Sequence, residues 1–258
     1  MFIDVRTIDS IIKSLTEIFN TTPKEIIYIA NQINKLEYDK FISFVNERLI
    51  RKPDKIMIFH LSRRLNSDTK DKIINSIDNL LKESPYTRFL NKYDISFTYR
   101  NGKFDILKNN KIINLSNYYD NDAKLLKNRL GQSSIKDYSI CGFMFMPTKS
   151  NTDYLDYLKE GPEFIINISA LFGDKIMQDY KKNSKYYCYI AIVPIDIVEI
   201  CDNKALNAIS VLLYNCFIKI NAYINKSDNG FINDIIMLPN FYQICSNEII
   251  DIIELSDN

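Results

Sequence analysis

The spacing of apolar residues changes along this chain, and that change limits the folds the chain can adopt. Between residues 8 and 19, apolar side chains recur every three or four positions, which indicates an amphipathic helix. Between residues 95 and 106 they alternate with polar side chains, and Asn101-Gly102 in the middle is typical of a two-residue hairpin turn. We therefore expect an α+β fold with a mixed or antiparallel sheet core and an N-terminal helical subdomain.

The clearest break in the chain is Arg51-Lys52-Pro53-Asp54. The apolar pattern before this break predicts three helices, at residues 8–19, 23–33 and 38–50. Thr22 and Pro23 have the positions of an N-cap and a first-turn proline for the second helix. We therefore predict a helical subdomain over residues 1–52, which could also contact a protein partner, and an α+β main domain over residues 53–258.

The main domain is expected to contain several strands and helices. The predicted strands lie at residues 55–61, 95–99, 104–106, 112–115, 138–146, 185–200, 235–238 and 249–253. The predicted helices lie at residues 67–81, 122–130, 153–158, 164–180 and 206–224. Asn109-Asn110 predicts a second turn after the hairpin, so the stretch from residue 95 to 115 is expected to be an antiparallel meander.

Composition excludes several broad classes. With 46% hydrophobic and 25% charged residues the chain is expected to be globular, and its net charge of +1 excludes a uniformly basic surface but not a local basic patch. No apolar stretch reaches the roughly 18 residues of a membrane helix, and the N-terminus does not build a signal-type core. The five cysteines show no CxxC spacing, so we expect no metal, no disulfide framework and a cytoplasmic location.

His60 is the only histidine, so any histidine-based step must use it. It lies near the end of the apolar run 55–61, where a strand delivers side chains to the rim of a sheet. Arg63 and Arg64 follow, and an imidazole with two fixed cations suits an anionic ligand such as a phosphate or pyrophosphate. The alternative is a histidine bonded to a backbone carbonyl, with both arginines in solvent.

Glu163 stands after Gly161-Pro162 and before an apolar run. A carboxylate at that point could stabilise a developing cation or polarise a hydroxyl. The alternative is a glutamate in the first turn of a helix, where the helix dipole favours it.

Tyr186-Tyr187-Cys188-Tyr189 could stack a ring, although strands favour aromatic residues without any ligand. Lys124, Lys127, Arg129 and Lys136 form a modest basic segment near several tyrosines. This segment could touch a nucleic-acid backbone, or it could be a solvated helix face.

Two segments resemble motifs of the ADP-ribosyltransferase superfamily. Ile58-Phe59-His60-Leu61-Ser62 is similar to the apolar–His–Gly–Thr strand of that family, with Leu61 and Ser62 in place of Gly and Thr. Cys141-Gly142-Phe143-Met144-Phe145 is similar to a later Gly–Phe–Tyr strand, without the tyrosine. The strand from Tyr189 to Pro194 resembles the strand that ends in Val-Pro in the family.

The resemblance implies a protein that binds NAD and transfers ADP-ribose to a protein or a nucleic acid, as in a bacterial toxin or a phage-defence effector. His60 would bond the ribose or phosphates, and Arg63 or Arg64 would meet the pyrophosphate. The matched positions Ser62 and Phe143 would also belong to the NAD site. The family expects a late catalytic glutamate beside His60, for which Glu163 is the first candidate.

Three alternatives remain open from the sequence. Glu248 is the second candidate for the catalytic glutamate. A non-catalytic partner-binding or sensor protein is favoured by the scarcity of polar motifs. A nuclease toxin could use His60 with Arg63 or Arg64 for acid–base work on a phosphodiester.

Overall fold

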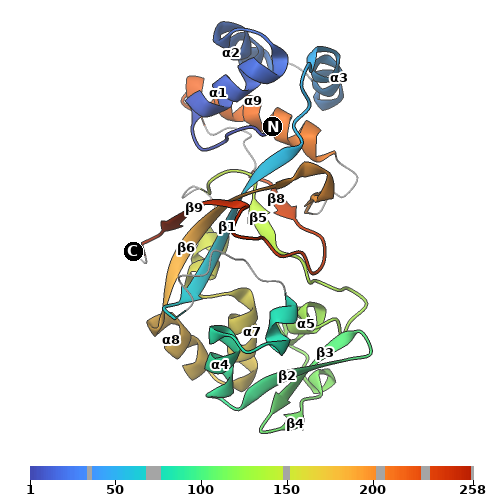
Figure 1. Ribbon diagram of the computed structural model, residues 1–258, viewed down its shortest axis with the longest axis vertical. Helices are drawn as coiled ribbons and strands as arrows, with labels where there is room; N and C mark the ends of the chain where they lie inside the picture. The colour runs from blue at the N-terminus through green and yellow to red at the C-terminus, as the bar shows by residue number, and fades with distance from the viewer. Residues whose placement is uncertain (34–36, 68–76, 148–151, 202–206, 228–232, 257–258) are drawn as a thin grey trace. The chain divides into compact units, whose positions relative to one another are not determined.

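The fold is α+β, as the sequence predicts, in a computed structural model that describes residues 1–33, 37–67, 77–147, 152–201, 207–227 and 233–256. The chain divides into two compact units (Figure 1). Unit 1 comprises Met1–Phe59, Cys141–Thr148 and Ile190–Leu238, and unit 2 comprises His60–Ile140, Lys149–Tyr189 and Pro239–Asn258. Among the described helices, none is both long enough and apolar enough to cross a membrane.

Unit 1 is built around the longest described helix, α9 (Ala208–Ile224), which is apolar on most of its surface. The three N-terminal helices pack against it: α1 (Ile8–Phe19), α2 (Pro23–Gln32) and α3 (Tyr38–Arg48). The Phe217 ring of α9 lies 6.0 Å from that of Phe19 and 5.5 Å from that of Phe41. The N-terminal helices therefore bury their apolar faces on a helix from far along the chain, and the unit division differs from the expected boundary after residue 52.

The local signals at the start of the second helix act as the sequence predicts. Thr22 Oγ1 accepts a hydrogen bond from the Glu25 amide at 3.3 Å, and Pro23 occupies the first turn of α2. Thr7 caps α1 in the same way through the Ser10 amide.

A six-stranded sheet has the strand order β7-β8-β5-β1-β6-β9. The strands are β7 (Glu199–Ile200), β8 (Ile235–Met237), β5 (Cys141–Phe143), β1 (Lys55–Leu65), β6 (Ser184–Pro194) and β9 (Ile249–Glu254). β5 is shorter than the strand expected at residues 138–146, whereas β1 continues four residues beyond its expected end. β6 ends at Pro194, which has no amide proton to donate, and a short 3₁₀ turn η5 (Ile195–Ile197) follows before β7.

Unit 2 contains the predicted meander as a separate antiparallel sheet of β2 (Ile95–Arg100), β3 (Lys103–Lys108) and β4 (Lys111–Ile112). Asn101 and Gly102 both have positive φ angles, of 51° and 78°, as the tight hairpin turn requires. Asn109 and Asn110 also have positive φ angles, at the turn between β3 and β4. The period-two pattern and both turns are therefore confirmed.

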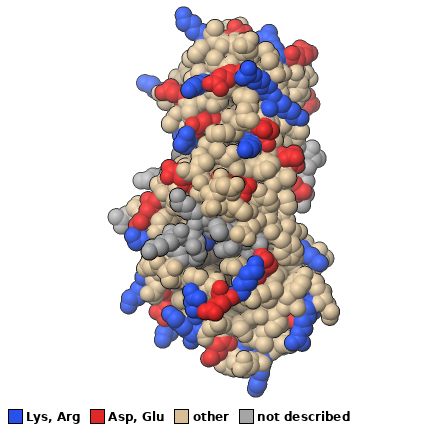
Figure 2. Space-filling model, viewed as in Figure 1, with Lys and Arg blue, Asp and Glu red and all other residues tan. Residues whose placement is uncertain are grey.

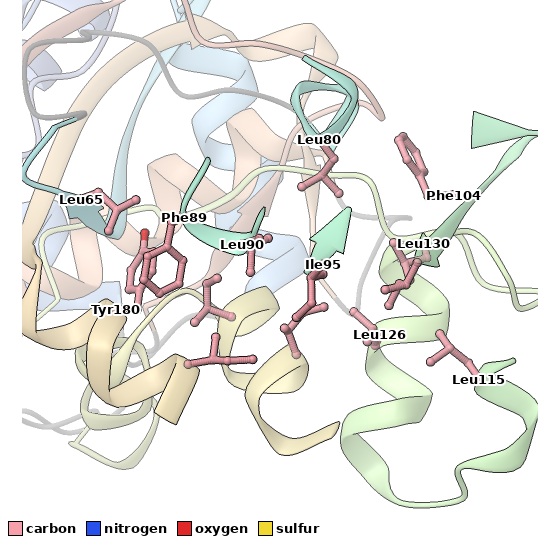
Figure 3. Packing of buried hydrophobic residues seen from close by; sticks show 14 of the residues in the cluster. Leu65, Leu80, Phe89, Leu90, Ile95, Phe104, Leu115, Leu126, Leu130 and Tyr180 are labelled. Carbon is pink, nitrogen blue, oxygen red and sulfur yellow. The ribbon is translucent and has the colours of Figure 1, made fainter. Parts of the chain in front are cut away.

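Helices and strands of unit 2 both contribute residues to its hydrophobic core (Figure 3). The helices of this unit are α4 (Pro85–Asn91), α5 (Asn121–Arg129), α6 (Thr152–Glu160), α7 (Glu163–Phe172) and α8 (Lys175–Lys182), with 3₁₀ turns η2 (Ile77–Leu81) and η3 (Leu115–Asn117). The single helix expected at residues 164–180 is divided at Gly173 into α7 and α8. Most of the helix expected at residues 67–81 lies outside the described residues. The Phe89 and Tyr180 rings meet edge to face at 5.2 Å in this core.

Gly131 allows α5 to end against Tyr138. Its φ angle is +66°, and a Cβ atom there would lie 1.7 Å from the Tyr138 hydroxyl oxygen. That hydroxyl donates to the Gly102 carbonyl at 3.3 Å, so Tyr138 connects the end of α5 to the β2–β3 turn.

We expect Gly131→Ala to lower the free energy of unfolding by about 3 kcal/mol, because it combines left-handed backbone strain with a steric clash. Gly102→Ala is the matched control, because its φ angle is also positive and no atom lies closer than 4.0 Å to the new Cβ. We expect that change to cost about 1 kcal/mol. Urea denaturation of both variants measures the difference, and equal losses would show that Tyr138 does not need the glycine.

Candidate functional site

The β1 strand places three of the predicted site residues on one side of the sheet. Successive side chains in a strand point to opposite faces, so His60, Ser62 and Arg64 share one face. His60 and Ser62 are half-buried, and Arg64 is buried. All three belong to unit 2. Alternation therefore brings together every second residue of this segment and separates Arg63 from the other three.

The neighbouring strand β6 adds aromatic side chains to the same face. One backbone hydrogen bond lies just beyond each end of the β1–β6 pair. Asn66 N donates to the Asn183 carbonyl at 2.9 Å, and Ile195 N donates to the Asp54 carbonyl at 3.0 Å. Both bonds fit one antiparallel register, in which His60 lies opposite Tyr189 and Ser62 lies opposite Tyr187. We define the His60 face as the side chains of His60, Ser62, Arg64, Lys185, Tyr187 and Tyr189.

The arginine of the His60 face is held by an aromatic ring. The Arg64 guanidinium carbon lies 5.0 Å from the centre of the Tyr189 ring, a cation–π contact. Tyr189 is 1% exposed and meets Tyr187 edge to face at 6.2 Å. The two tyrosines therefore form a buried support for Arg64, and the half-buried groups of the face are His60 and Ser62. This support is the role that the structure gives to the predicted Tyr186–Tyr189 group.

A carboxylate from β9 also reaches the His60 face. Glu254 accepts hydrogen bonds from the Lys185 ammonium at 2.8 and 3.1 Å. Burial raises the pKa of the Tyr187 hydroxyl, and so does the charge of Glu254 next to it. Glu254 was missed in the sequence because it lies in an ordinary edge strand with no motif around it. Only the order of the strands reveals its position.

Arg63 has a different environment from Arg64, although the two are adjacent. Its side chain points to the opposite face of β1 and is 1% exposed. The guanidinium donates to the Ser184 hydroxyl at 2.9 Å, the Lys159 carbonyl at 2.8 Å and the Ser184 carbonyl at 3.1 Å. Lys159 is in the last turn of α6, so Arg63 binds a helix C-terminus, which carries partial negative charge. The expected pyrophosphate role does not suit Arg63, because its guanidinium donors are already bonded to Ser184 and Lys159.

Glu163 is the first residue of α7 and pairs with Arg129 near the end of α5. The Glu163 carboxylate lies 2.6 Å from Arg129 Nη2, and Asp137 lies 3.1 Å from Arg129 Nε. Nearby, buried Asn167 donates to Asp122 at 2.8 Å. This arrangement matches the first-turn glutamate that the sequence left as an alternative. None of these hydrogen bonds or ion pairs joins Glu163 to the His60 face.

Two further predicted residues lie apart from the His60 face. Phe143 is 5% exposed in β5 of unit 1, where it pairs with Phe59 of β1. Glu248 accepts from the Tyr242 hydroxyl at 2.5 Å and from the Cys245 amide at 2.8 Å, so it closes a local turn before β9. His60, Ser62 and Arg64 therefore remain together, and Arg63, Phe143, Glu163 and Glu248 do not join them in any described contact.

The cysteines and the acidic residues show no metal centre within the described ranges. No three His, Cys, Asp or Glu side chains there lie close enough to hold an ion. Burial raises the pKa of the Cys188 thiol to about 12, and burial also raises the pKa of the Cys216 thiol.

Comparison with known proteins gives no relative. No family model, curated protein or solved structure matches this chain.

The two adjacent arginines are expected to respond differently to the loss of their charge. Arg63→Leu should lower the free energy of unfolding by about 3 kcal/mol, because several buried acceptors lose their donor. Arg64→Leu should cost less than Arg63→Leu, because its cation–π contact with Tyr189 contributes only about 1 kcal/mol. Urea unfolding of the two variants measures both losses, and a larger loss for Arg64→Leu would contradict the assigned roles.

Proposed function

We propose that unit 2 is an ADP-ribosyltransferase-like enzyme that binds NAD on the His60 face and transfers ADP-ribose to a macromolecular target. The observation that carries the proposal is the convergence of His60, Ser62 and Arg64 on one face, with Arg64 held over Tyr189. The resemblance of the segment around His60 to the superfamily strand motif supports the choice of NAD.

The chemistry of these side chains fits the phosphate and ribose portions of NAD. A guanidinium recognises phosphate oxygens with two parallel hydrogen bonds, and its planar geometry makes the orientation specific. The Tyr189 ring, 5.0 Å from the guanidinium carbon, supports Arg64. The His60 imidazole and the Ser62 hydroxyl donate or accept hydrogen bonds, which suits ribose hydroxyls.

The proposed reaction breaks the bond between ribose C1′ and the nicotinamide nitrogen. The electron pair of that bond leaves with nicotinamide, and a nucleophile of the target bonds to C1′ and loses its proton. Positive charge develops on the ribose as the bond breaks, so a carboxylate held nearby lowers the barrier. His60 and Arg64 hold the substrate so that this bond faces the carboxylate.

Glu254 is the carboxylate that fits this role best. It is bonded to Lys185, a member of the His60 face, while Glu163 and Glu248 are bonded to residues outside that face. Lys185 orients the carboxylate, as a second charged group often does in a site. The proposal therefore assigns the acidic role to Glu254 in place of the two glutamates expected from the sequence.

A cavity in unit 1 favours a second function, the binding of a small ligand without catalysis. It has a volume of about 630 Å³ and is lined by apolar side chains, including Ile195 and Ile209, and by Lys52, Asp54 and Asp196. The volume is within the range of small-molecule sites, and the hollow is open to solvent, with Asp54 and Asp196 exposed. This function needs none of the residues of the His60 face.

The transferase proposal is tested by incubating the protein with adenylate-labelled NAD and a mixture of RNA, DNA and protein. We expect label on one class of target and a loss of about 100-fold in His60→Ala, since positioned acid–base groups contribute that much. Glu254→Gln should also reduce transfer by about 100-fold, because it removes the stabilising charge. Glu163→Gln is the matched control and should retain transfer within about threefold.

Each other outcome excludes the proposal or assigns the acidic role to a different residue. A loss confined to Glu163→Gln would return the acidic role to that residue. Cleavage of RNA or DNA without NAD, lost in His60→Ala, would replace the transferase with a nuclease. No label and no cleavage by a folded protein would leave the ligand-binding function of unit 1.

A further inference from the structure

The strand β9 forms one edge of the six-stranded sheet. It is last in the strand order, so β6 lies on one side of it and no described strand lies on the other. It has six residues, whereas β7 at the opposite end of the sheet has two. The edge strand β2 of the three-stranded sheet also has six residues, but α4 and η2 pack against it. Among the described strands, β9 is therefore the long edge at which another strand could pair.

Both faces of β9 present isoleucine side chains to solvent. Ile250 is 43% exposed and Ile253 is 37% exposed. Alternation puts these two side chains on opposite faces of the strand, because their positions differ by three. An exposed apolar edge strand is a template for pairing with another chain. A strand added beside β9 would therefore cover an isoleucine on each face.

The backbone of β9 leaves hydrogen-bonding groups at its open edge. The Leu255 amide, just after the strand, donates to the Tyr186 carbonyl of β6 at 2.9 Å. Backbone groups of successive residues in a strand point to opposite sides, so those of Ile250, Ile252 and Glu254 point away from β6. These are the groups to which an added strand would bond.

An aspartate covers part of this open edge. The Asp251 carboxylate accepts a hydrogen bond from the Ile252 amide at 2.8 Å, and this amide is one of the outward donors. Asp251 is exposed and forms no ion pair with a described residue, whereas Glu254 is paired with Lys185. A strand that bonds to the Ile252 amide must displace this carboxylate. A cation opposite Asp251 would favour that displacement, because it gives the carboxylate a new partner.

The charges of β9 oppose pairing with a second copy of the chain. The run from Glu248 to Glu254, E-I-I-D-I-I-E, reads the same in both directions. A two-fold antiparallel pairing that sets isoleucine opposite isoleucine also sets Asp251 opposite Asp251 of the second copy, and Glu248 opposite Glu254. Like charges directly opposite each other destabilise a sheet. The edge therefore disfavours its own copy and favours a strand with a central cation.

The wider surface gives no competing charge signal on the face that Figure 2 draws. Lys and Arg are interspersed there with Asp and Glu. Neither sign of charge dominates that face, so it selects neither a polyanion nor a polycation. The choice of partner therefore rests on the local pattern of β9.

We propose that β9 is a docking edge for an extended segment of a partner protein, which adds to the sheet as a further strand. The segment has aliphatic residues on both sides of a central Lys or Arg, and this cation faces Asp251. Main-chain hydrogen bonds supply the affinity of such strand addition, and the charge pair supplies the specificity. The inference is independent of the transferase proposal, because docking requires neither NAD nor the carboxylate of Glu254.

The test measures the fluorescence anisotropy of a labelled synthetic peptide as full-length protein is added, without NAD. The peptide has two valines on each side of a central lysine and a threonine at each end. We expect this lysine peptide to bind. The same peptide with glutamate in place of lysine should bind about tenfold more weakly, since the pair with Asp251 changes from opposite to like charge.

Asp251→Lys should reverse this preference, so that the glutamate peptide binds about tenfold more tightly than the lysine peptide. Glu17→Lys is the matched control, because Glu17 is exposed in the last turn of α1, where a cation is favourable. It changes the net charge equally and should keep the preference for the lysine peptide. Urea denaturation checks that both variants are folded.

Three results would overturn the inference. The first is a lack of binding, or equal binding of the lysine and glutamate peptides. The second is unchanged binding of a lysine peptide that carries N-methyl groups on the alternate amides facing β9, because strand addition needs those amides. The third is self-association of the protein in sedimentation that Ile253→Lys abolishes, which would assign the edge to a second copy.

Discussion

The antiparallel pairing of β1 with β6 is the interaction on which the candidate site depends. Because side chains alternate along β1, Arg63 and Arg64 enter opposite environments although they are adjacent. Arg63 satisfies carbonyls at the end of α6 and in β6, while Arg64 is held over Tyr189 on the other face. A shift of one residue in β1 would exchange these roles and leave a buried arginine without its acceptors. The buried Arg63 network therefore also fixes which face His60 occupies.

The sequence predicts most of the elements because they depend on local signals. The helical spacing of residues 8–19 and the Asn101-Gly102 turn are read from neighbouring residues, and both appear where they are expected. The predicted end of β1 was wrong, because the polar residues Ser62, Arg63 and Arg64 suggested that the strand had stopped. A predicted strand that continued to residue 65 would have placed the two arginines on opposite faces. The sequence therefore contained this information, in a form that depends on the exact length of one strand.

Other features depend on contacts between distant parts of the chain, so no local pattern predicts them. The apolar faces of α1, α2 and α3 need a surface to cover them, but nothing in residues 1–52 indicates that α9 supplies it. The same is true of Glu254, which reaches Lys185 of the His60 face only because β9 lies next to β6. Tertiary packing decides the order of the strands. A functional residue that enters a site through strand order therefore cannot be predicted from sequence motifs.

The charged residues of the chain follow two different rules, one for buried side chains and one for exposed side chains. In the interior, Arg63 is matched by several acceptors, because an unmatched buried charge is strongly destabilising. At the β2–β3 turn, Arg100 and Lys103 are exposed and opposed, which costs less than about 1 kcal/mol in solvent. A small unfavourable term of this kind can persist because water screens the two exposed charges. Burial therefore decides whether an arginine needs acceptors within the fold, since Arg63 has several and Arg100 tolerates a cation opposite it.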